Sequence, residues 1–542
     1  MGTVKSSVAA CCVAVALAAC SCAVSAATYY VDSVDGNDSN AGTSQTAPWQ
    51  TLDKVNATTF EPGDRILFRR GRSWFGKLNP KGSGTPANPI EINTYRNGPK
   101  PLIDGGGSTG DGVLYFHNQE YWEANHLELT NDATDEGDRR GVLISASNFG
   151  VVDHIYLKEL DIHDIKGIAG QSISAKDTGG IGIKLLDDDL VDTRFNDILI
   201  EGCTISRVDN TGIYSRSAAG GANTPGSANF ARRKITNLYI RGNQINDIAK
   251  NAMIIRMTDN TCVVEHNVCW DTCMRVNTGN TIFGRSVDGT VFQYNEGYLN
   301  HSTGGYDGSL YDADLECYNA TFQYSYSHDN AHGLIWFASK PDDTGTTVRY
   351  NISQNDHGII FALRSTFVHA SFYNNVVYIP EHLSPEIIQE RDGRTFEYEF
   401  YNNIIYNLSP TATYTFNDGT RDIDSNIFFG VHPANEPADA NKITSDPMFV
   451  EPGSGGIGLD TLDGYMLQPG SPAIDSGRTV AGAPPVDFWG NPVPLDDRVD
   501  RGVNEFQAPP GTPLAGSAAS SLLCILIVIT ALSTGSRRNH NA

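Results

Sequence analysis

The middle of the chain alternates short apolar runs with polar or small residues, mostly Asn, Asp and Gly. A representative stretch, residues 196–217, reads NDILIEGCTISRVDNTGIYSRS and contains three such runs separated by short polar turns. Within the runs, apolar and polar residues tend to alternate, which is typical of β-strands with one buried face. The pattern therefore predicts an all-β protein rather than a helical one.

This unit of three runs recurs along the chain. Successive units align on one polar position at intervals of 23 to 30 residues: Asn243, Asn267, Asn295, Ser325, Asn351, Asn374 and Asn402. One unit cannot bury its own apolar face, so neighbouring units must stack and share a continuous core, with parallel strands about 4.8 Å apart. The repeat predicts a solenoid of β-coils with three strands in each coil.

The aligned asparagines are interpreted as structural. Asn tolerates the left-handed backbone conformation of tight turns, and amides at the same position in successive coils can bond to one another along the stack. Earlier coils carry longer loops, expected at residues 169–179, 186–195 and 218–232. Loops on a rigid scaffold often carry binding sites.

The two ends of the chain differ from the repeats. Residues 1–26 combine Lys5, an apolar stretch and small residues, which is typical of a cleaved secretory signal peptide, with lipidation of Cys20 as the alternative. Residues 508–542 combine a Pro-rich linker, an apolar run and two arginines, which predicts a membrane anchor or a processed sorting signal. The sequence thus predicts a secreted protein anchored at the cell surface or outer envelope.

Composition narrows the possible partners. The formal net charge of −24 argues against nucleic acid, because phosphate binding requires a basic surface. The body of the chain has an odd number of cysteines and no CxxC pair, so no disulfide framework or zinc site is recognisable. These cysteines are Cys203, Cys262, Cys269, Cys273 and Cys317.

Several stretches resemble a bacterial family of right-handed parallel β-helix proteins related to pectate lyases. Residues 28–71, with the Pro62-Gly63-Asp64 turn, resemble the family's N-terminal cap, and QYSYSHDNAHG (323–333) resembles its inner coils. Residues 445–453, 464–477 and 487–507 resemble a closing module that precedes an anchor. The resemblance covers roughly residues 28–507 and implies this fold. Relatives include polysaccharide lyases, lacto-N-biosidases, xylosidases, epimerases and proteins without known activity, so it implies a carbohydrate partner and no single reaction.

The resemblance and the repeats together divide the chain into five parts. These are a signal peptide (1–26), an N-terminal cap with the first coils (27–110), the β-helix core (111–430), a closing module (431–507), and a linker with the anchor or sorting tail (508–542).

Four basic residues fall at one position of the aligned third runs: Lys184, Arg216, Arg256 and Arg285. Alternation turns their apolar neighbours inward, so this basic column is expected to face outward. Stacked cations repel one another unless acids or an anionic ligand lie between them. The column is therefore a candidate substrate-binding site, with a ladder neutralised by acids as the alternative.

The next run contains the candidate catalytic acids. Asp312 and Asp314 are two residues apart, so on a strand they share one face at about 6.6 Å, a separation that suits glycoside hydrolysis. Asp307 precedes Asp314 by seven residues, a spacing that resembles the acidic pair of β-helix lacto-N-biosidases. The alignment turns Asp312 inward, which requires an early strand end or a bulge. An Asp-rich turn that caps strands or holds Ca²⁺ is the structural alternative; no cofactor is otherwise expected.

Two histidines and one tryptophan complete the candidates. His328 and His332 lie in the turns of the following coil, where they are candidates for proton transfer and for substrate binding. Trp336 falls at an inward position of the alignment and is expected in the core.

Three functions fit these features. A glycosidase would use Asp307, Asp312 and Asp314 as acid and nucleophile or base. A polysaccharide lyase would use an arginine or lysine of the basic column to remove a proton beside a uronate carboxylate. A non-catalytic adhesin or scaffold would need only the repeats and the anchor. We favour a glycosidase that acts as a monomer on an oligosaccharide or polysaccharide and reaches the membrane only through its tail.

Overall fold

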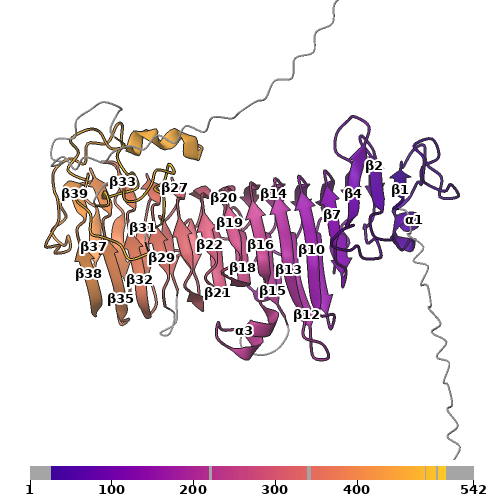
Figure 1. Cartoon of the computed structure of the whole chain (residues 1–542), viewed down its shortest axis with the longest axis horizontal. Coiled ribbons are helices and arrows are strands. Elements are labelled where there is room, and N and C mark those ends of the chain that lie inside the picture. The colour runs from indigo at the N-terminus through magenta and orange to yellow at the C-terminus, as the bar shows by residue number, and fades with distance from the viewer. Residues whose placement is uncertain (1–25, 219–222, 339–343, 483, 496–497, 508–542) are drawn as a thin grey trace, which may run out of the picture.

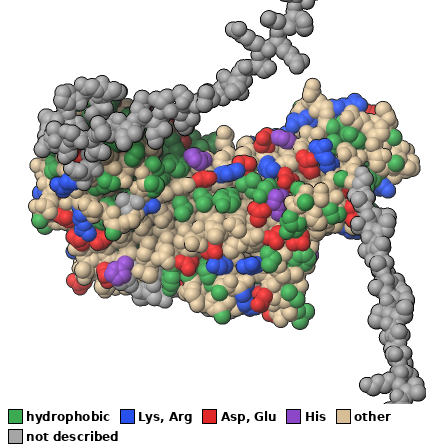
Figure 2. Space-filling model, viewed as in Figure 1, with side chains coloured by type: hydrophobic (Ala, Val, Ile, Leu, Met, Phe, Trp, Pro, Cys, Tyr) green, Lys and Arg blue, Asp and Glu red, His purple; other side chains and the backbone are tan. Residues whose placement is uncertain are grey.

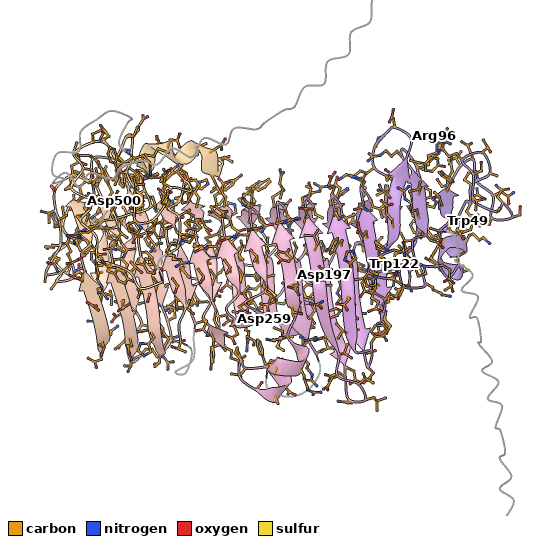
Figure 3. All side chains as sticks on the ribbon, viewed as in Figure 1. Trp49, Arg96, Trp122, Asp197, Asp259 and Asp500 are labelled. Atoms are coloured by element: carbon orange, nitrogen blue, oxygen red, sulfur yellow. The ribbon has the colours of Figure 1, made fainter. Side chains whose placement is uncertain are left out.

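The structure, a computed structural model, describes residues 26–218, 223–338, 344–482, 484–495 and 498–507. It is a right-handed parallel β-helix, as expected. Figure 1 shows an elongated stack of coils with the N-terminal end at the right and the C-terminal end at the left. Trp122 lies near the first end and Asp500 at the other (Figure 3).

The first sheet has 14 strands. In spatial order they are β1 (Thr28–Val31), β2 (Arg65–Arg69), β4 (Ile90–Tyr95), β7 (Trp122–Asn125), β10 (Val151–Lys158), β13 (Arg194–Glu201), β16 (Thr236–Arg241), β19 (Val263–Glu265), β22 (Val291–Gln293), β26 (Thr321–Gln323), β29 (Thr347–Arg349), β32 (Phe367–Tyr373), β35 (Phe396–Tyr401) and β38 (Gly419–Asp424).

The second sheet has 13 strands. They are β3 (Ser73–Phe75), β5 (Leu102–Asp104), β8 (Glu128–Asn131), β11 (Asp161–Ile165), β14 (Thr204–Val208), β17 (Gln244–Ile248), β20 (Val268–Thr272), β23 (Glu296–Asn300), β27 (Tyr326–His328), β30 (Ile352–Gln354), β33 (Val376–Ile379), β36 (Ile404–Asn407) and β39 (Ile427–Gly430).

The third sheet has 12 strands and carries the candidate site. They are β6 (Gly112–His117), β9 (Arg140–Ser147), β12 (Gly179–Asp187), β15 (Thr211–Ser217), β18 (Asn251–Asp259), β21 (Ile282–Asp288), β24 (Tyr311–Ala313), β28 (Ile335–Phe337), β31 (Ile359–Leu363), β34 (Glu386–Glu390) and β37 (Thr413–Thr415), with β25 (Cys317–Tyr318) also paired to β21.

The three sheets enclose one apolar core that runs along the helix axis. Ile213, Met253 and Ile282 have no exposed surface, which confirms the inward direction predicted for them. Successive side chains of a strand point to opposite faces, so the residues next to these three on their strands point out of the β-helix. The five body cysteines are buried free thiols.

A ladder of asparagine side chains connects successive coils at one corner. The Asn267 amide donates to Oδ1 of Asn295 at 3.0 Å, and its own Oδ1 accepts from Nδ2 of Asn243 at 2.8 Å. Ser325 occupies the same position one coil later, and its backbone N–H donates to Oδ1 of Asn351. The predicted structural role is confirmed for these residues.

For Asn374 and Asn402 the predicted alignment is one residue off. The ladder runs through Asn375 and Asn403, whose amides form the coil-to-coil bonds. Asn374 and Asn402 have φ angles of 54° and 56°, and their amides donate to carbonyl groups of the C-terminal segment. The left-handed turn and the amide ladder thus occupy adjacent positions. The pairs of adjacent asparagines conceal this in the sequence.

In the described part of the chain, three α-helices flank the coils. Helix α1 (Leu52–Ala57) lies at the N-terminal end, where the Thr51 side chain accepts a hydrogen bond from the backbone N–H of Lys54. Helix α2 (Ile173–Lys176) lies within the predicted loop 169–179. Helix α3 (Ala228–Arg233) begins in the predicted loop 218–232 and ends one residue beyond it, and Figure 1 shows it outside the coils.

The C-terminal segment packs on the outside of the late coils (Figure 1). It includes the 3₁₀-helix η1 (Leu459–Tyr465). Phe449, Leu462 and Tyr465 bury themselves against Tyr350 and Ile352 of the coils. This packing covers the apolar outer corner of those coils.

The predicted signal peptide, apart from residue 26, and the predicted tail at 508–542 lie outside the described residues. Among the residues that are described, no helix is long and apolar enough to cross a membrane.

Candidate active site

The three candidate acids meet on the outer face of the third sheet. Asp312 of β24 pairs in register with Phe283 of β21 on one side and with Trp336 of β28 on the other. Asp314 follows β24 directly, and its backbone N–H continues the ladder by donating to the Gly284 carbonyl at 3.0 Å. Asp307 lies in the loop that leads into β24.

The prediction that Asp312 points inward is wrong, because the predicted alignment of β24 with β21 is shifted by one residue. Ile282 pairs with Tyr311 rather than with Leu310, so Asp312 and Asp314 both point outward without a bulge. Tyr311 points into the core, where its hydroxyl contacts Asn295 and Ser325 of the ladder. Leu310 and Tyr311 are both fully buried, and two adjacent apolar residues leave the alternation ambiguous.

Each acid has its own polar contact. Thr278 Oγ1 donates to Asp307 Oδ2 at 2.5 Å, and Asn280 Nδ2 donates to Asp312 Oδ2 at 2.8 Å. Arg285 Nη1 lies 3.6 Å from Asp314 Oδ2. Thr278 and Asn280 precede β21, so one coil supplies the groups that hold the acids of the next.

Burial and mutual repulsion raise the pKa values of two of these acids. Asp312 is only 8% exposed, and its Oδ1 is buried without a hydrogen-bond partner. Its burial, followed by the charges of Asp314 and Asp307, raises its pKa well above the usual range. Burial also raises the pKa of Asp314, whose side chain is 19% exposed, although Arg285 opposes this. The cluster thus combines a carboxyl group that retains a proton with more exposed carboxyl groups beside it.

The basic column predicted from the sequence exists. Lys184 pairs with Arg216 and Arg256 pairs with Arg285 on neighbouring strands, and β15 pairs with β18 in the same register. Lys184 and Arg216 both form ion pairs with the buried Asp177, at 3.0 Å for Lys184. The predicted alternative, neutralisation by acids, therefore holds for this half of the column.

The other half of the column joins a cluster of cations beside the acids. The Arg256 guanidinium and the Lys176 ammonium both lie over the Phe283 ring, at 5.7 and 5.5 Å from its centroid. Burial lowers the pKa of Lys176, and Lys250 and Arg256 lower it further. Burial and then Arg285 lower the pKa of Arg256 to about 10. Lys250 is buried, and its ammonium donates to the Thr278 carbonyl.

His332 lies beside this cluster, whereas His328 does not. The backbone N–H of Ile359 donates to His332 Nδ1 at 2.8 Å, and burial lowers the pKa of this histidine, so it is neutral at pH 7 with its proton on Nε2. Asp307 and Arg364 are the charges that act on it.

His328 belongs to β27 of the second sheet, on a different face from the acids. It is buried, it stacks on Tyr298 and Tyr326, and it bonds to Glu296 and Asp329. Burial alone would lower its pKa, but these two hydrogen bonds raise it to about 9. The structure does not bring it to the acids because adjacent coil segments belong to different sheets.

Trp336 is not in the core, contrary to the prediction. It points outward with Asp312 and packs in a separate outer cluster with Ile359 and Ala362. The Arg364 guanidinium lies 5.1 Å from the centroid of the Trp336 ring and 4.5 Å from that of Tyr306, whose side chain is 58% exposed. The same one-residue shift that moves Asp312 outward moves Trp336.

Several residues of the site were not predicted from the sequence. Lys176 and Asp177 come from the predicted loop 169–179, so the loop was the available signal. Phe283 lies within strand β21, and the others lie in turns or loops next to aligned strands, where no pattern distinguishes them from ordinary turn residues. The residues missed are Lys176, Asp177, Lys250, Thr278, Asn280, Phe283, Tyr306 and Arg364.

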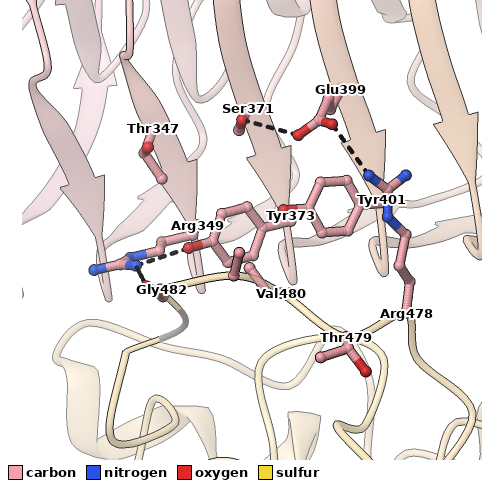
Figure 4. Close-up of a pocket in the computed structure, with 11 residues that line it drawn as sticks. Thr347, Arg349, Ser371, Tyr373, Glu399, Tyr401, Arg478, Thr479, Val480 and Gly482 are labelled. Atoms are coloured by element: carbon pink, nitrogen blue, oxygen red, sulfur yellow. Dashed lines mark hydrogen bonds and ion pairs between the residues drawn. The ribbon is translucent and has the colours of Figure 1, made fainter.

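A hollow lies away from the acids, between the outer face of the first sheet and the C-terminal segment (Figure 4). Its cavity is about 310 Å³. Tyr373 and Tyr401 stack at 5.2 Å, Arg478 covers Tyr401, and Arg478 also bonds to Glu399. The protein's own side chains thus cover part of these rings, and no acid of the cluster on the third sheet lines this cavity.

One acidic group has the spacing of a metal site. Among the described residues, ligand atoms of Asp187, Asp188 and Asp189 lie within 4.8 Å of one another. Asp188 is already paired with Arg233 and lies 3.5 Å from Arg232. Arginine charge therefore already balances part of this group. The Ca²⁺ predicted as an alternative for the Asp-rich turn at Asp307 and Asp314 concerns a different place and remains a prediction.

The outer face of the first sheet carries interspersed charges. Figure 2 shows acidic and basic side chains side by side on the viewed face. Lys158 pairs with Glu123 and Arg241 with Glu201 there. Such exposed pairs between neighbouring strands need no ligand to explain them.

The chain was compared with protein families and with individual known proteins. No family model matches the chain. The lacto-N-biosidase of Bifidobacterium longum subsp. longum is 30% identical over an alignment that covers 86% of this chain and 36% of that protein, so the chain spans about a third of its relative.

Solved structures share the fold. Two crystal structures of the GH136 lacto-N-biosidase from Eubacterium ramulus, the native protein and a selenomethionine derivative, superpose with TM-scores of 0.58 and 0.57. They are 22% and 23% identical to this chain, and the match covers 73% of it and 68% of them. The parallel β-helix is therefore common to these proteins and this chain.

Proposed function

We propose that this protein is a glycoside hydrolase that cleaves a glycan at the acid cluster of the third sheet. The observation that carries the proposal is the gathering of Asp307, Asp312 and Asp314 on one outer face, with one buried carboxyl whose pKa is strongly raised. Glycoside hydrolysis needs one protonated and one ionised carboxyl on either side of the scissile bond. Here the carboxyl groups differ in burial and in neighbouring charges, so they differ in how readily they hold a proton.

The contacts suggest how the acids divide this work. The charge of Asp314 raises the pKa of Asp312, so the pair retains one proton to higher pH than an isolated carboxyl would. Asp314 is the more exposed of the two and would deliver the proton to the leaving oxygen. Asp307, which accepts a hydrogen bond from Thr278, would act as nucleophile or as the base that activates water.

The likeness to lacto-N-biosidases narrows the proposed substrate. We infer that the chain cleaves glycans of the lacto-N-biosidase type, and the sequence likeness over 86% of this chain supports this. The spacing of Asp307 and Asp314, which resembles the acidic pair of those enzymes, supports it as well.

A second candidate function is a polysaccharide lyase. Arg256 favours it, because burial and neighbouring cations lower its pKa to about 10, towards the range of a usable base. In that reaction the acids would not take part in the chemistry.

One experiment separates these functions. The protein is incubated with an aryl glycoside of lacto-N-biose and with a panel of neutral and uronic polysaccharides, and both new reducing ends and ultraviolet absorption are measured. A hydrolase produces reducing ends only, a lyase produces absorbing unsaturated ends, and an adhesin binds without either product. Cleavage that persists in Asp307→Asn, Asp312→Asn and Asp314→Asn would refute the proposed site.

We also propose that the protein is exported and held at the cell surface by its C-terminal tail, which the apolar terminal segments of the sequence support. Fractionation of cells that express the full chain and a version ending at residue 507 tests this. Release of the shortened version alone is expected, and equal retention of both would contradict it.

A further inference from the structure

We propose that Lys176, Arg256 and Arg285 form an anion subsite beside the acids, which binds the carboxylate or sulfate group of an acidic sugar. The role of this subsite in a cleavage reaction rests on the proposed function. The proposed class of ligand, an anionic sugar, rests only on the charges of these residues.

The three cations come from separate elements and converge on one place. Arg256 of β18 and Arg285 of β21 are direct neighbours in the third sheet. Lys176 ends helix α2 and reaches the same Phe283 ring as Arg256, at 5.5 and 5.7 Å. A loop and two strands thus bring three positive charges to one side of the acids.

The cations of the proposed subsite do not share the acidic partner of the other two basic residues of the column. Asp177 neutralises Lys184 and Arg216. Among the described residues, the only ion pair of the three is that of Arg285 with Asp314, at 3.6 Å. The Nε of Arg256 is buried and has no hydrogen-bond partner. A buried donor without a partner costs free energy, and an anionic oxygen bound there would satisfy it.

Charge repulsion supports the same conclusion. Arg256 and Arg285 lie on adjacent strands about 4.8 Å apart, where like charges repel strongly at partial burial. Burial and these neighbours lower the pKa values of Lys176 and Arg256. An anion held between them would offset both the repulsion and the lost hydration.

The subsite is placed to act on the substrate of the acids. Gly284 pairs with Ala313, so the next residues along each strand, Arg285 and Asp314, face each other. An acidic sugar bound here would lie on the side of the acids nearer the N-terminal coils, opposite to Trp336. The chain as a whole carries a net charge of −24 and repels anionic glycans, so a local basic subsite is what admits one.

Binding measurements test the subsite independently of cleavage. Glucuronic acid, glucose 6-sulfate and glucose are titrated into the full chain and followed by ligand-observed NMR at low salt. We expect both acidic sugars, or one of them, to bind at least tenfold more tightly than glucose. A preference for one acid identifies the anion as carboxylate or as sulfate.

Variants assign the preference to these residues. Arg256→Gln and Lys176→Gln should each reduce the preference for acidic sugars over glucose at least fivefold. Arg285→Gln is a third variant at a more exposed position, and it tests the subsite even if Arg256→Gln does not fold. Arg241→Gln removes an exposed cation of the first sheet and should leave the preference unchanged. Equal binding of glucose and both acids, or a preference that survives all three variants, would overturn the proposal.

Failure of the subsite proposal can be distinguished from failure of the glycosidase proposal. If the protein cleaves no glycan but binds acidic sugars through these residues, the subsite stands and the glycosidase proposal fails. If it cleaves a neutral glycan and shows no preference for an anion, the reverse holds.

Discussion

Asp312 of β24 lies directly beside Trp336 of β28, and both side chains point away from the core of the β-helix. The same register places Phe283 on the other side of Asp312. A carboxyl group between two aromatic side chains loses hydration, which is the main cause of its raised pKa. The predictions about activity follow from this arrangement.

Replacement of the two less buried acids should greatly slow cleavage. Asp314→Asn and Asp307→Asn remove the proposed proton donor and the proposed nucleophile or base, so kcat should fall by about 10²- to 10⁴-fold for each. Asp288→Asn is the matched control, because Asp288 ends strand β21 and contacts Asn319, away from the cluster. Initial rates on one cleavable glycan provide the measurement. A control variant as inactive as the others would point to misfolding instead.

The basic limb of the pH profile should move to higher pH in two variants. The proton donor must be protonated, so activity is lost as pH rises through its pKa. Lys176→Gln removes a cation whose charge lowers the pKa of Asp314 and should move the basic limb to higher pH. Arg285→Gln removes a cation that lowers the pKa of Asp314 and should move the limb to higher pH. Profiles of kcat/KM that coincide with the wild type would argue against Asp314 as the donor.

Trp336→Ala should weaken substrate binding more than it slows the chemical step. Trp336 is 9% exposed and supports the more exposed Tyr306 ring beside the acids; such an aromatic contact is worth about 0.5–1.5 kcal/mol, so KM should rise roughly 2- to 12-fold. Trp336→Phe should retain part of this. Trp270→Ala changes a tryptophan that stacks on Tyr298 in the second sheet and should leave KM unchanged. A loss of kcat with unchanged KM would contradict the expectation.

Interruption of the asparagine ladder should destabilise the coils. Asn267→Ala leaves the backbone N–H and the amide of Asn243 without their acceptor. Each buried donor left without a partner costs on the order of 1–3 kcal/mol. Asn260→Ala, at an exposed turn, should cost far less. Urea unfolding followed by circular dichroism measures both, and equal midpoints would show that the ladder contributes little.

The folded protein should lose stability as pH rises from about 6.5 to 9. The pKa of His328 is raised to about 9 in the folded state, so its stabilising contribution is complete below its unfolded pKa of about 6.5 and is lost as pH passes through 9. Burial raises the pKa of Glu505 to about 8, which acts in the same direction. His328→Gln should flatten the upper part of the curve of Tm against pH. An unchanged slope would exclude His328 as a cause.

The sequence alone was sufficient for the fold and for part of the site. The repeat, the inward positions of Ile213 and Met253, and the basic column depend on periodicity, which local alternation and stacking impose on every coil. The three acids are at most seven residues apart in the chain, so one strand and its approach loop bring them to one face.

Only the tertiary structure decided the rest. Where two apolar residues are adjacent, as at Leu310 and Tyr311, alternation permits two registers, and packing against the asparagine ladder selects one. That choice turns Asp312 and Trp336 outward. Lys176 reaches Phe283 from a loop more than a hundred residues earlier, and His328 lies on another sheet although it follows the acids closely. A side chain's neighbours in a β-helix are set by register between coils, which sequence distance does not encode.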